Sequence, residues 1–208
     1  MEVGAAWLPP VLHVKTYGIT GGIGMGKSAT AQILRERAVA VVDTDDLARQ
    51  AVRKGEPALN EIRAAFGESV FNSAGELDRD GLAGVVFPDA AARRKLEAIL
   101  HPRIQQLWRD QLEAWRREGR SLAVVIVPLL YETQAESEFD TVICIACTAV
   151  TQQQRLQSRG LRPDQIQQRV SAQMPVVEKM ARAHRVLWSE GNLDVLARQC
   201  ERVITPLA

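Results

Sequence analysis

The sequence lacks the features typical of secreted, membrane-bound and nucleic-acid-binding proteins. Three cysteines in 208 residues are too few for a disulfide framework. The longest apolar run, 122–131, is interrupted by Pro128 and is shorter than the ~20 residues of a membrane-spanning helix. A net charge of +1 provides no basic field for nucleic acid or acidic lipid. The first residues have no basic flank typical of a secretory signal, so we expect a cytoplasmic protein with no nucleic-acid, membrane or obligate protein partner.

The one close pair of cysteines, Cys144 and Cys147, does not indicate a metal or redox site. The pair lies in TVICIACTAV, a β-branched run that predicts a buried strand. Residues three apart on a strand point to opposite faces, which suits neither a disulfide nor a zinc site. We interpret both as buried apolar side chains.

The residues that are present predict an α/β protein, either one large domain or one domain with an insertion. Apolar runs of the kind that are covered on both faces predict a parallel sheet flanked by helices. Residues 55–118 are expected to be almost wholly helical. The expected strands are 11–20, 39–43, 122–127, 141–146 and 185–188, and the expected helices are 29–38, 58–66, 89–100, 102–118, two stretches within 151–175 and one from Asn192.

A glycine-rich segment follows the first expected strand and precedes a helix. Gly21, Gly26, Lys27 and Ser28 satisfy the P-loop pattern GxxxxGK[ST] in the required context. Glycines let backbone N–H groups surround a phosphate chain at the positive end of a helix, and the lysine adds a cation. The hydroxyl of Ser28 would hold Mg²⁺. The segment therefore predicts binding of a nucleoside triphosphate.

Other segments narrow the class of P-loop protein. No Asn-Lys pair is present, so the base-reading NKxD of GTPases is missing, and the DxxG at 78–81 follows no strand. The strand ending at Val127 runs into PLLYE rather than into the acidic residues usual in large motor and transporter ATPases. These segments argue against a GTPase and against a large motor or transporter ATPase.

The motifs GGIGMGKS, VVDTDDLARQ, GELDRDGL, LHP, VPLLYE and QQQRLQSRG, in this order, resemble the dephospho-CoA kinase family from about residue 15 to 191. That family transfers the γ-phosphate of ATP to the ribose 3′-hydroxyl of dephospho-CoA and uses Mg²⁺. The resemblance implies a P-loop NTPase core with an inserted helical substrate domain and a small helical lid. By this likeness the core is 15–54, 120–150 and 176–208, the insertion 55–119 and the lid 151–175, while 1–14 form an extension without an assigned role.

The resemblance also implies roles for individual residues. Asp45 is similar to the family's catalytic carboxylate, Lys27 acts with it, and Arg155 and Arg159 neutralise the transferring phosphate. The ATP phosphates are held by Gly22, Ile23, Gly24, Met25, Gly26, Lys27 and Ser28, with Ser28 also the magnesium ligand. The residues implied to bind the acceptor are Asp43, Arg49, Arg79, His101, Pro128, Leu129, Tyr131 and Glu132.

Several alternatives stay open. Asp43 or Asp45 can instead cap a helix that begins near Leu47, His101 can be structural, and surface arginines are commonly solvated. Residues 183–191, AHRVLWSEG, depart from the family pattern on its nucleotide side. The competing functions are another P-loop nucleotide or metabolite kinase and a non-catalytic ATP-binding module.

Overall fold

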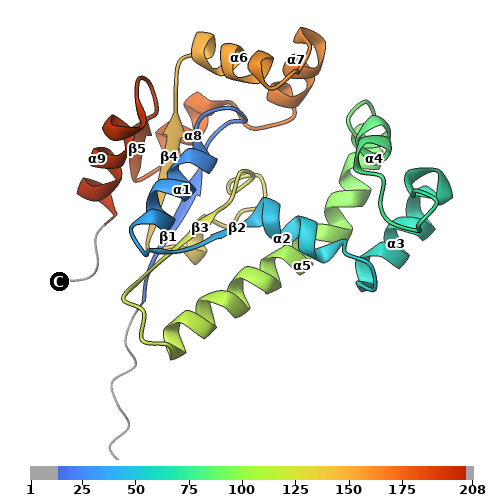
Figure 1. The fold of residues 1–208 in the computed structure, drawn as a ribbon, viewed down its shortest axis with the longest axis horizontal. Helices are drawn as coiled ribbons and strands as arrows, with labels where there is room; N and C mark the ends of the chain where they lie inside the picture. Colours follow the sequence, from blue (N-terminus) through green and yellow to red (C-terminus); the bar gives the residue numbers. More distant parts are fainter. Residues whose placement is uncertain (1–13, 205–208) are drawn as a thin grey trace, which may run out of the picture.

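The computed structural model describes residues 14–204 and contains a five-stranded parallel sheet (Figure 1). The spatial order is β2-β3-β1-β4-β5. The predicted parallel sheet flanked by helices is confirmed. Residues 11–13 of the first predicted strand, and the expected extension before Val14, lie outside the described residues. The strands are β1 (Lys15–Thr20), β2 (Ala40–Asp43), β3 (Leu122–Ile126), β4 (Thr141–Ala146) and β5 (Arg185–Trp188).

Each face of the sheet is covered by different helices, which explains the uninterrupted apolar runs of its central strands. Alternate residues of β3 point to opposite faces. One set packs with α1 (Lys27–Glu36) and α9 (Leu193–Val203). The other set packs with the second half of α5 (Ala90–Arg117) and with the connection between β3 and β4. The result is a three-layer core.

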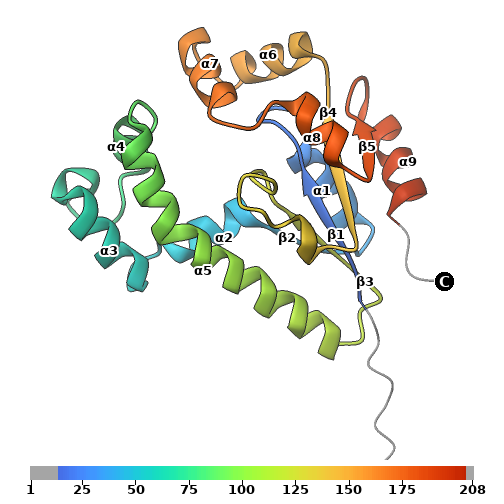
Figure 2. The same ribbon diagram turned by 180° about the vertical axis from the view of Figure 1, so that it is seen from behind.

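A second group of helices lies to the side of the sheet (Figures 1 and 2). It comprises α3 (Pro57–Phe66), α4 (Arg79–Val86) and the first half of α5. Their apolar side chains form a core of their own around Ile62, Val70, Leu82 and Val86. Between this group and the sheet lies α2 (Thr44–Ala51), which begins directly after β2.

The long helix α5 corrects the sequence analysis. We expected two helices, 89–100 and 102–118, but the structure has one helix with Pro102 inside it. Proline has no N–H to donate to the carbonyl four residues earlier, so a break was the simplest expectation. The helix continues because its two halves are anchored in different cores, Leu96 and Ile99 in the side group and Trp108 and Leu112 against the sheet.

Three further helices follow β4. The helices α6 (Ala149–Ser158) and α7 (Pro163–Ser171) lie beyond the end of β4, and α8 (Val176–Arg182) leads back into β5 (Figure 1). The sequence analysis did not predict α8. All three cysteines are free and buried, as expected for Cys144 and Cys147. Among the described helices none is long and apolar enough to cross a membrane.

Candidate active site

The sheet brings three chain segments together at one edge. Ile126 of β3 is level with Ile19 of β1 on one side and with Asp43 of β2 on the other. All three strands are parallel, so the glycine loop, the start of α2 and the turn at Pro128 all leave the sheet at this edge. In open α/β sheets, ligands bind outside the carboxyl ends of the strands.

At two positions the glycine loop passes so close to its neighbours that a side chain is excluded. Gly21 has a φ of +142°, and a Cβ added there would lie 2.2 Å from the carbonyl oxygen of Ile145. Gly24 has a φ of +77° and lies against Leu156 of α6. The loop therefore needs glycine both for its backbone conformation and for its packing on β4 and α6.

Lys27 closes the glycine loop. Its Nζ donates hydrogen bonds to the carbonyl oxygens of Gly21, at 2.8 Å, and Gly22, at 2.9 Å. Burial lowers the pKa of Lys27 to about 8, against the opposing attraction of the Asp45 and Asp43 carboxylates. The loop thus holds a desolvated cation close to two acids.

The acids after β2 have different environments. The Asp43 carboxylate accepts a hydrogen bond of 2.9 Å from the Asp45 N–H and caps α2. The helix begins at Thr44 rather than near Leu47, and Asp43, not Asp45, is its cap. Burial, and to a lesser extent the neighbouring carboxylates of Asp45 and Asp46, raise the pKa of Asp43. Asp45 is exposed.

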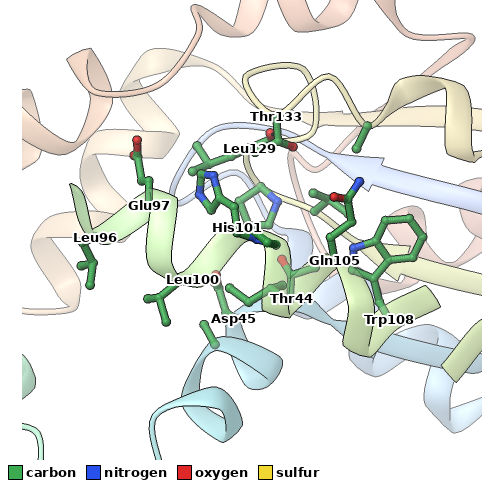
Figure 3. Close-up of a pocket in the computed structure, with 16 residues that line it drawn as sticks. Thr44, Asp45, Leu96, Glu97, Leu100, His101, Gln105, Trp108, Leu129 and Thr133 are labelled. Atoms are coloured by element: carbon green, nitrogen blue, oxygen red, sulfur yellow. The ribbon is translucent and has the colours of Figure 1, made fainter. Parts of the chain in front are cut away.

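Asp45 faces a pocket of about 380 Å³ between α2, α5 and the turn after β3 (Figure 3). Trp108, buried in the apolar stripe of α5, forms part of its floor. His101 is half-buried and lies in its wall, as do Pro128 and Leu129. An apolar pocket with a few polar groups is the usual form of a small-molecule site. The remaining polar lining residues are Thr44, Glu97, Gln105 and Thr133.

Tyr131 and Glu132 do not line this pocket, although we expected both to do so. The chain after Pro128 folds back, so Tyr131 enters the sheet core beneath the guanidinium of Arg182. Glu132 turns toward α8, where its carboxylate pairs with Lys179 at 2.8 Å. Lys179 is fully buried and also donates to the Pro128 carbonyl at 2.7 Å. These contacts stabilise the turn after Pro128. They join residues far apart in the sequence, so no local sequence pattern predicts them.

Residues 151–175, a segment rich in glutamine, contact the glycine loop directly. Gln152 of α6 donates to the carbonyl of Ile23 at 2.7 Å, and the Ile23 N–H donates to the Gln173 side chain at 2.9 Å. In this structure the N–H that we expected at the ATP phosphates is therefore bonded to protein. The sequence analysis missed both glutamines, since many glutamines of this segment look alike in the sequence.

Arg155 and Arg159, four residues apart at the end of α6, have different surroundings. Arg155 donates to the side chain and carbonyl of Ser189, and the Ser189 hydroxyl donates to the Met25 carbonyl at 2.9 Å. Arg159 is the exposed C-cap residue that follows α6. Within the segment 183–191, Ser189 thus contacts the glycine loop. His184 of the same segment accepts a hydrogen bond of 2.9 Å from the Val142 N–H of β4.

Arg49 and Arg79, both expected near the acceptor, lie apart from the Asp45 pocket. They line a second pocket of about 250 Å³ at the end of α2.

Comparisons with known proteins show which family the sequence resembles. A sequence model described as dephospho-CoA kinase matches residues 15–194. A dephospho-CoA kinase of Anaeromyxobacter dehalogenans is 42% identical over 195 residues, covering 93% of this chain and 92% of that protein. One from Geobacter sulfurreducens is 40% identical over 187 residues, covering 89% and 95% of the two chains.

Solved structures show the same fold. A crystal structure from Thermus thermophilus superimposes with a TM-score of 0.78 at 35% identity, covering 92% of this chain and 96% of that one. A dephospho-CoA kinase from Campylobacter jejuni, at 20% identity, has a TM-score of 0.61 over 91% of this chain and 95% of its own.

Proposed function

Because the chain belongs to the dephospho-CoA kinase family, whose function is the ATP-dependent phosphorylation of dephospho-CoA, we propose that the Asp45 pocket receives the acceptor's ribose 3′-hydroxyl. The observation that carries this proposal is the meeting of three features at one sheet edge. They are the glycine loop with Lys27, the exposed carboxylate of Asp45, and an apolar pocket that opens beside that carboxylate.

The glycine loop holds the phosphates of ATP. The N–H groups of residues 22–27 surround them, and Lys27 leaves the carbonyls of Gly21 and Gly22 to reach the β- and γ-phosphates. Binding in this way exchanges the Ile23–Gln173 hydrogen bond for one to a phosphate oxygen. Residues 151–175 close over the site, exclude water and bring Arg155 and Arg159 to the transferring group.

Asp45 activates the acceptor. Its carboxylate accepts the proton of the 3′-hydroxyl as that oxygen bonds to the γ-phosphorus and the bond to the ADP oxygen breaks. An exposed carboxylate that caps no helix is free to approach a substrate. His101, Pro128 and Leu129 line the acceptor's side of the pocket, and the helical residues 55–119 contribute most of its remaining walls.

The residues present suit Mg²⁺ bound together with ATP. Ser28 is exposed in the first turn of α1 beside Lys27, and Asp43 lies at the end of β2, which β3 separates from β1. Both donors are oxygen atoms, as Mg²⁺ requires. Ser28 and, through water, Asp43 would hold the ion, which when bound neutralises charge on the phosphates.

The direct test is to incubate the purified protein with MgATP and dephospho-CoA and to identify the product by mass. We expect coenzyme A and ADP in equal amounts. A panel of other hydroxyl acceptors separates this activity from that of another metabolite kinase. ATP binding without any acceptor-dependent release of ADP would instead indicate a non-catalytic binding module.

The pH dependence of ATP binding tests the role of Lys27. Its pKa of about 8 in the free protein rises when phosphate oxygens favour the ammonium form. Below about pH 8 Lys27 is charged both in the free protein and in the ATP complex, so the affinity for ATP is at its maximum there. Above about pH 8 the free protein loses this charge, and the affinity falls by up to about tenfold per pH unit. We expect this trend in calorimetric titrations between about pH 7.5 and 9.5. The arginine of the Lys27→Arg variant stays charged, so the affinity of this variant for ATP should not vary with pH over this range. A wild-type affinity that is constant across this range would contradict the assignment.

A further inference from the structure

The second pocket, at the end of α2, is strongly cationic. Seven residues line it, four of them basic and one acidic: Arg49, Val52, Arg53, Lys54, Glu76, Leu77 and Arg79. Its volume of about 250 Å³ is below the roughly 300–1,000 Å³ of sites that enclose a drug-sized ligand. A pocket of this size and charge suits a small anionic group.

The basic side chains of this pocket are largely free of protein partners. Many arginines elsewhere pair with a carboxylate, as in Arg63–Glu68, Arg103–Glu61 and Arg109–Glu138. In the pocket, Arg49 pairs with Asp46 at 2.7 Å, and both side chains are exposed. Within residues 14–204, the side chains of Arg53, Lys54 and Arg79 have neither a hydrogen bond nor an ion pair.

The acid of the pocket does not neutralise these cations. The Glu76 carboxylate accepts a long hydrogen bond of 3.4 Å from the Asn72 amide, and no ion pair within residues 14–204 joins it to a basic residue. Positive charge therefore exceeds negative charge in the pocket. Guanidinium groups match phosphate oxygens through paired hydrogen bonds.

The pocket stands in a defined position relative to Asp45. Asp45 and Ala48 line the first pocket, while Arg49 and Val52, farther along the same face of α2, line the second. Asp45 and Arg49 are one helical turn apart, about 6 Å along the axis. In dephospho-CoA only C3′, C4′, C5′ and one oxygen separate the 3′-hydroxyl oxygen from the first phosphorus of the diphosphate. An acceptor whose hydroxyl lies at Asp45 therefore reaches Arg49 with its diphosphate.

We propose that the pocket formed by Arg49, Arg53, Lys54 and Arg79 binds the diphosphate of the acceptor. This inference rests on the proposed function of the Asp45 pocket. It adds that the enzyme selects its acceptor by the diphosphate group. Arg53 and Lys54 lie beyond the end of α2, more than one helical turn past Asp45. They act on acceptor affinity rather than on phosphoryl transfer.

The test is the double variant Arg53→Gln/Lys54→Gln, assayed with dephospho-CoA at several salt concentrations. We expect the KM for dephospho-CoA to rise by roughly tenfold or more, because charge-assisted hydrogen bonds are lost. The kcat at saturating acceptor and the KM for ATP should stay within about twofold, and the KM should depend less on salt than in the wild type. Arg198→Gln/Arg202→Gln, on exposed positions of α9, removes the same charge and should leave every constant unchanged.

Glu76→Gln provides a change of opposite sign, which misfolding would not produce. Removing the acid should lower the KM for dephospho-CoA by about two- to threefold. If the wild type phosphorylates dephospho-CoA but neither variant changes its KM, the pocket does not bind the acceptor and the inference is wrong. The inference would also be wrong if the variants changed only the response to added inorganic diphosphate and not the KM for dephospho-CoA. The pocket would then bind a free anion rather than the diphosphate of the acceptor. A wild type without coenzyme A synthesis would instead refute the proposed function.

Discussion

Lys27→Ala should lower kcat by at least about 10³-fold, equivalent to roughly 4 kcal/mol of transition-state stabilisation. In the structure the Lys27 ammonium is desolvated inside the glycine loop and donates hydrogen bonds to the carbonyls of Gly21 and Gly22. It acts on charge that develops during transfer, so saturating ATP should not restore kcat. Steady-state kinetics at ATP concentrations well above KM measure this effect.

The stability of this variant should change little. The loss of two hydrogen bonds, to the carbonyls of Gly21 and Gly22, is opposed by the removal of a buried cation whose pKa is lowered to about 8. Lys95→Ala, at an exposed position of α5, is the matched control and should retain full kcat. A Lys27→Ala enzyme with near-normal kcat at saturating ATP would remove Lys27 from the catalytic machinery.

Much of the sheet could be predicted because buried parallel strands carry their signal locally. The runs at 122–127 and 141–146 are nearly continuously apolar, and the structure places strands at both. The break expected at Pro102 was wrong, because packing of α5 in two separate cores outweighs one missing hydrogen bond. The short helix α8 was missed, since its fully buried residue is Lys179, which an amphipathic pattern counts as polar.

The candidate site was predictable only where residue type and spacing indicate chemistry by themselves. The glycine loop and the acids after β2 lie where the motifs predicted, at one edge of the sheet. The contacts that hold them do not follow from spacing. Gln173 is 150 residues from Ile23, and Ser189 is 164 residues from Met25. Tyr131 and Glu132 were misplaced for the same reason, because the turn after Pro128 is shaped by α8. The roles of the individual site residues stay predictions.

Asp45→Asn is expected to reduce turnover by about 10²- to 10⁴-fold, the usual size of a general-base contribution. The substitution keeps the size of the side chain but removes the oxygen that accepts the proton of the 3′-hydroxyl. The free energy of unfolding should be almost unchanged, because Asp45 is exposed and Asp43 provides the cap of α2. Initial rates at saturating MgATP and dephospho-CoA, with thermal unfolding measured in parallel, give both quantities.

Asp43→Asn is the matched control, since asparagine caps a helix about as well as aspartate. It removes the carboxylate at the end of β2, whose pKa is raised by burial. The asparagine side chain can still accept the hydrogen bond from the Asp45 N–H. Its turnover should fall less than that of Asp45→Asn. Asp45→Ala should match Asp45→Asn in turnover, because neither side chain accepts the proton. If Asp43→Asn were the more damaging variant at equal stability, Asp43 would be the base, and the pocket beside Asp45 would have to receive a different part of the acceptor.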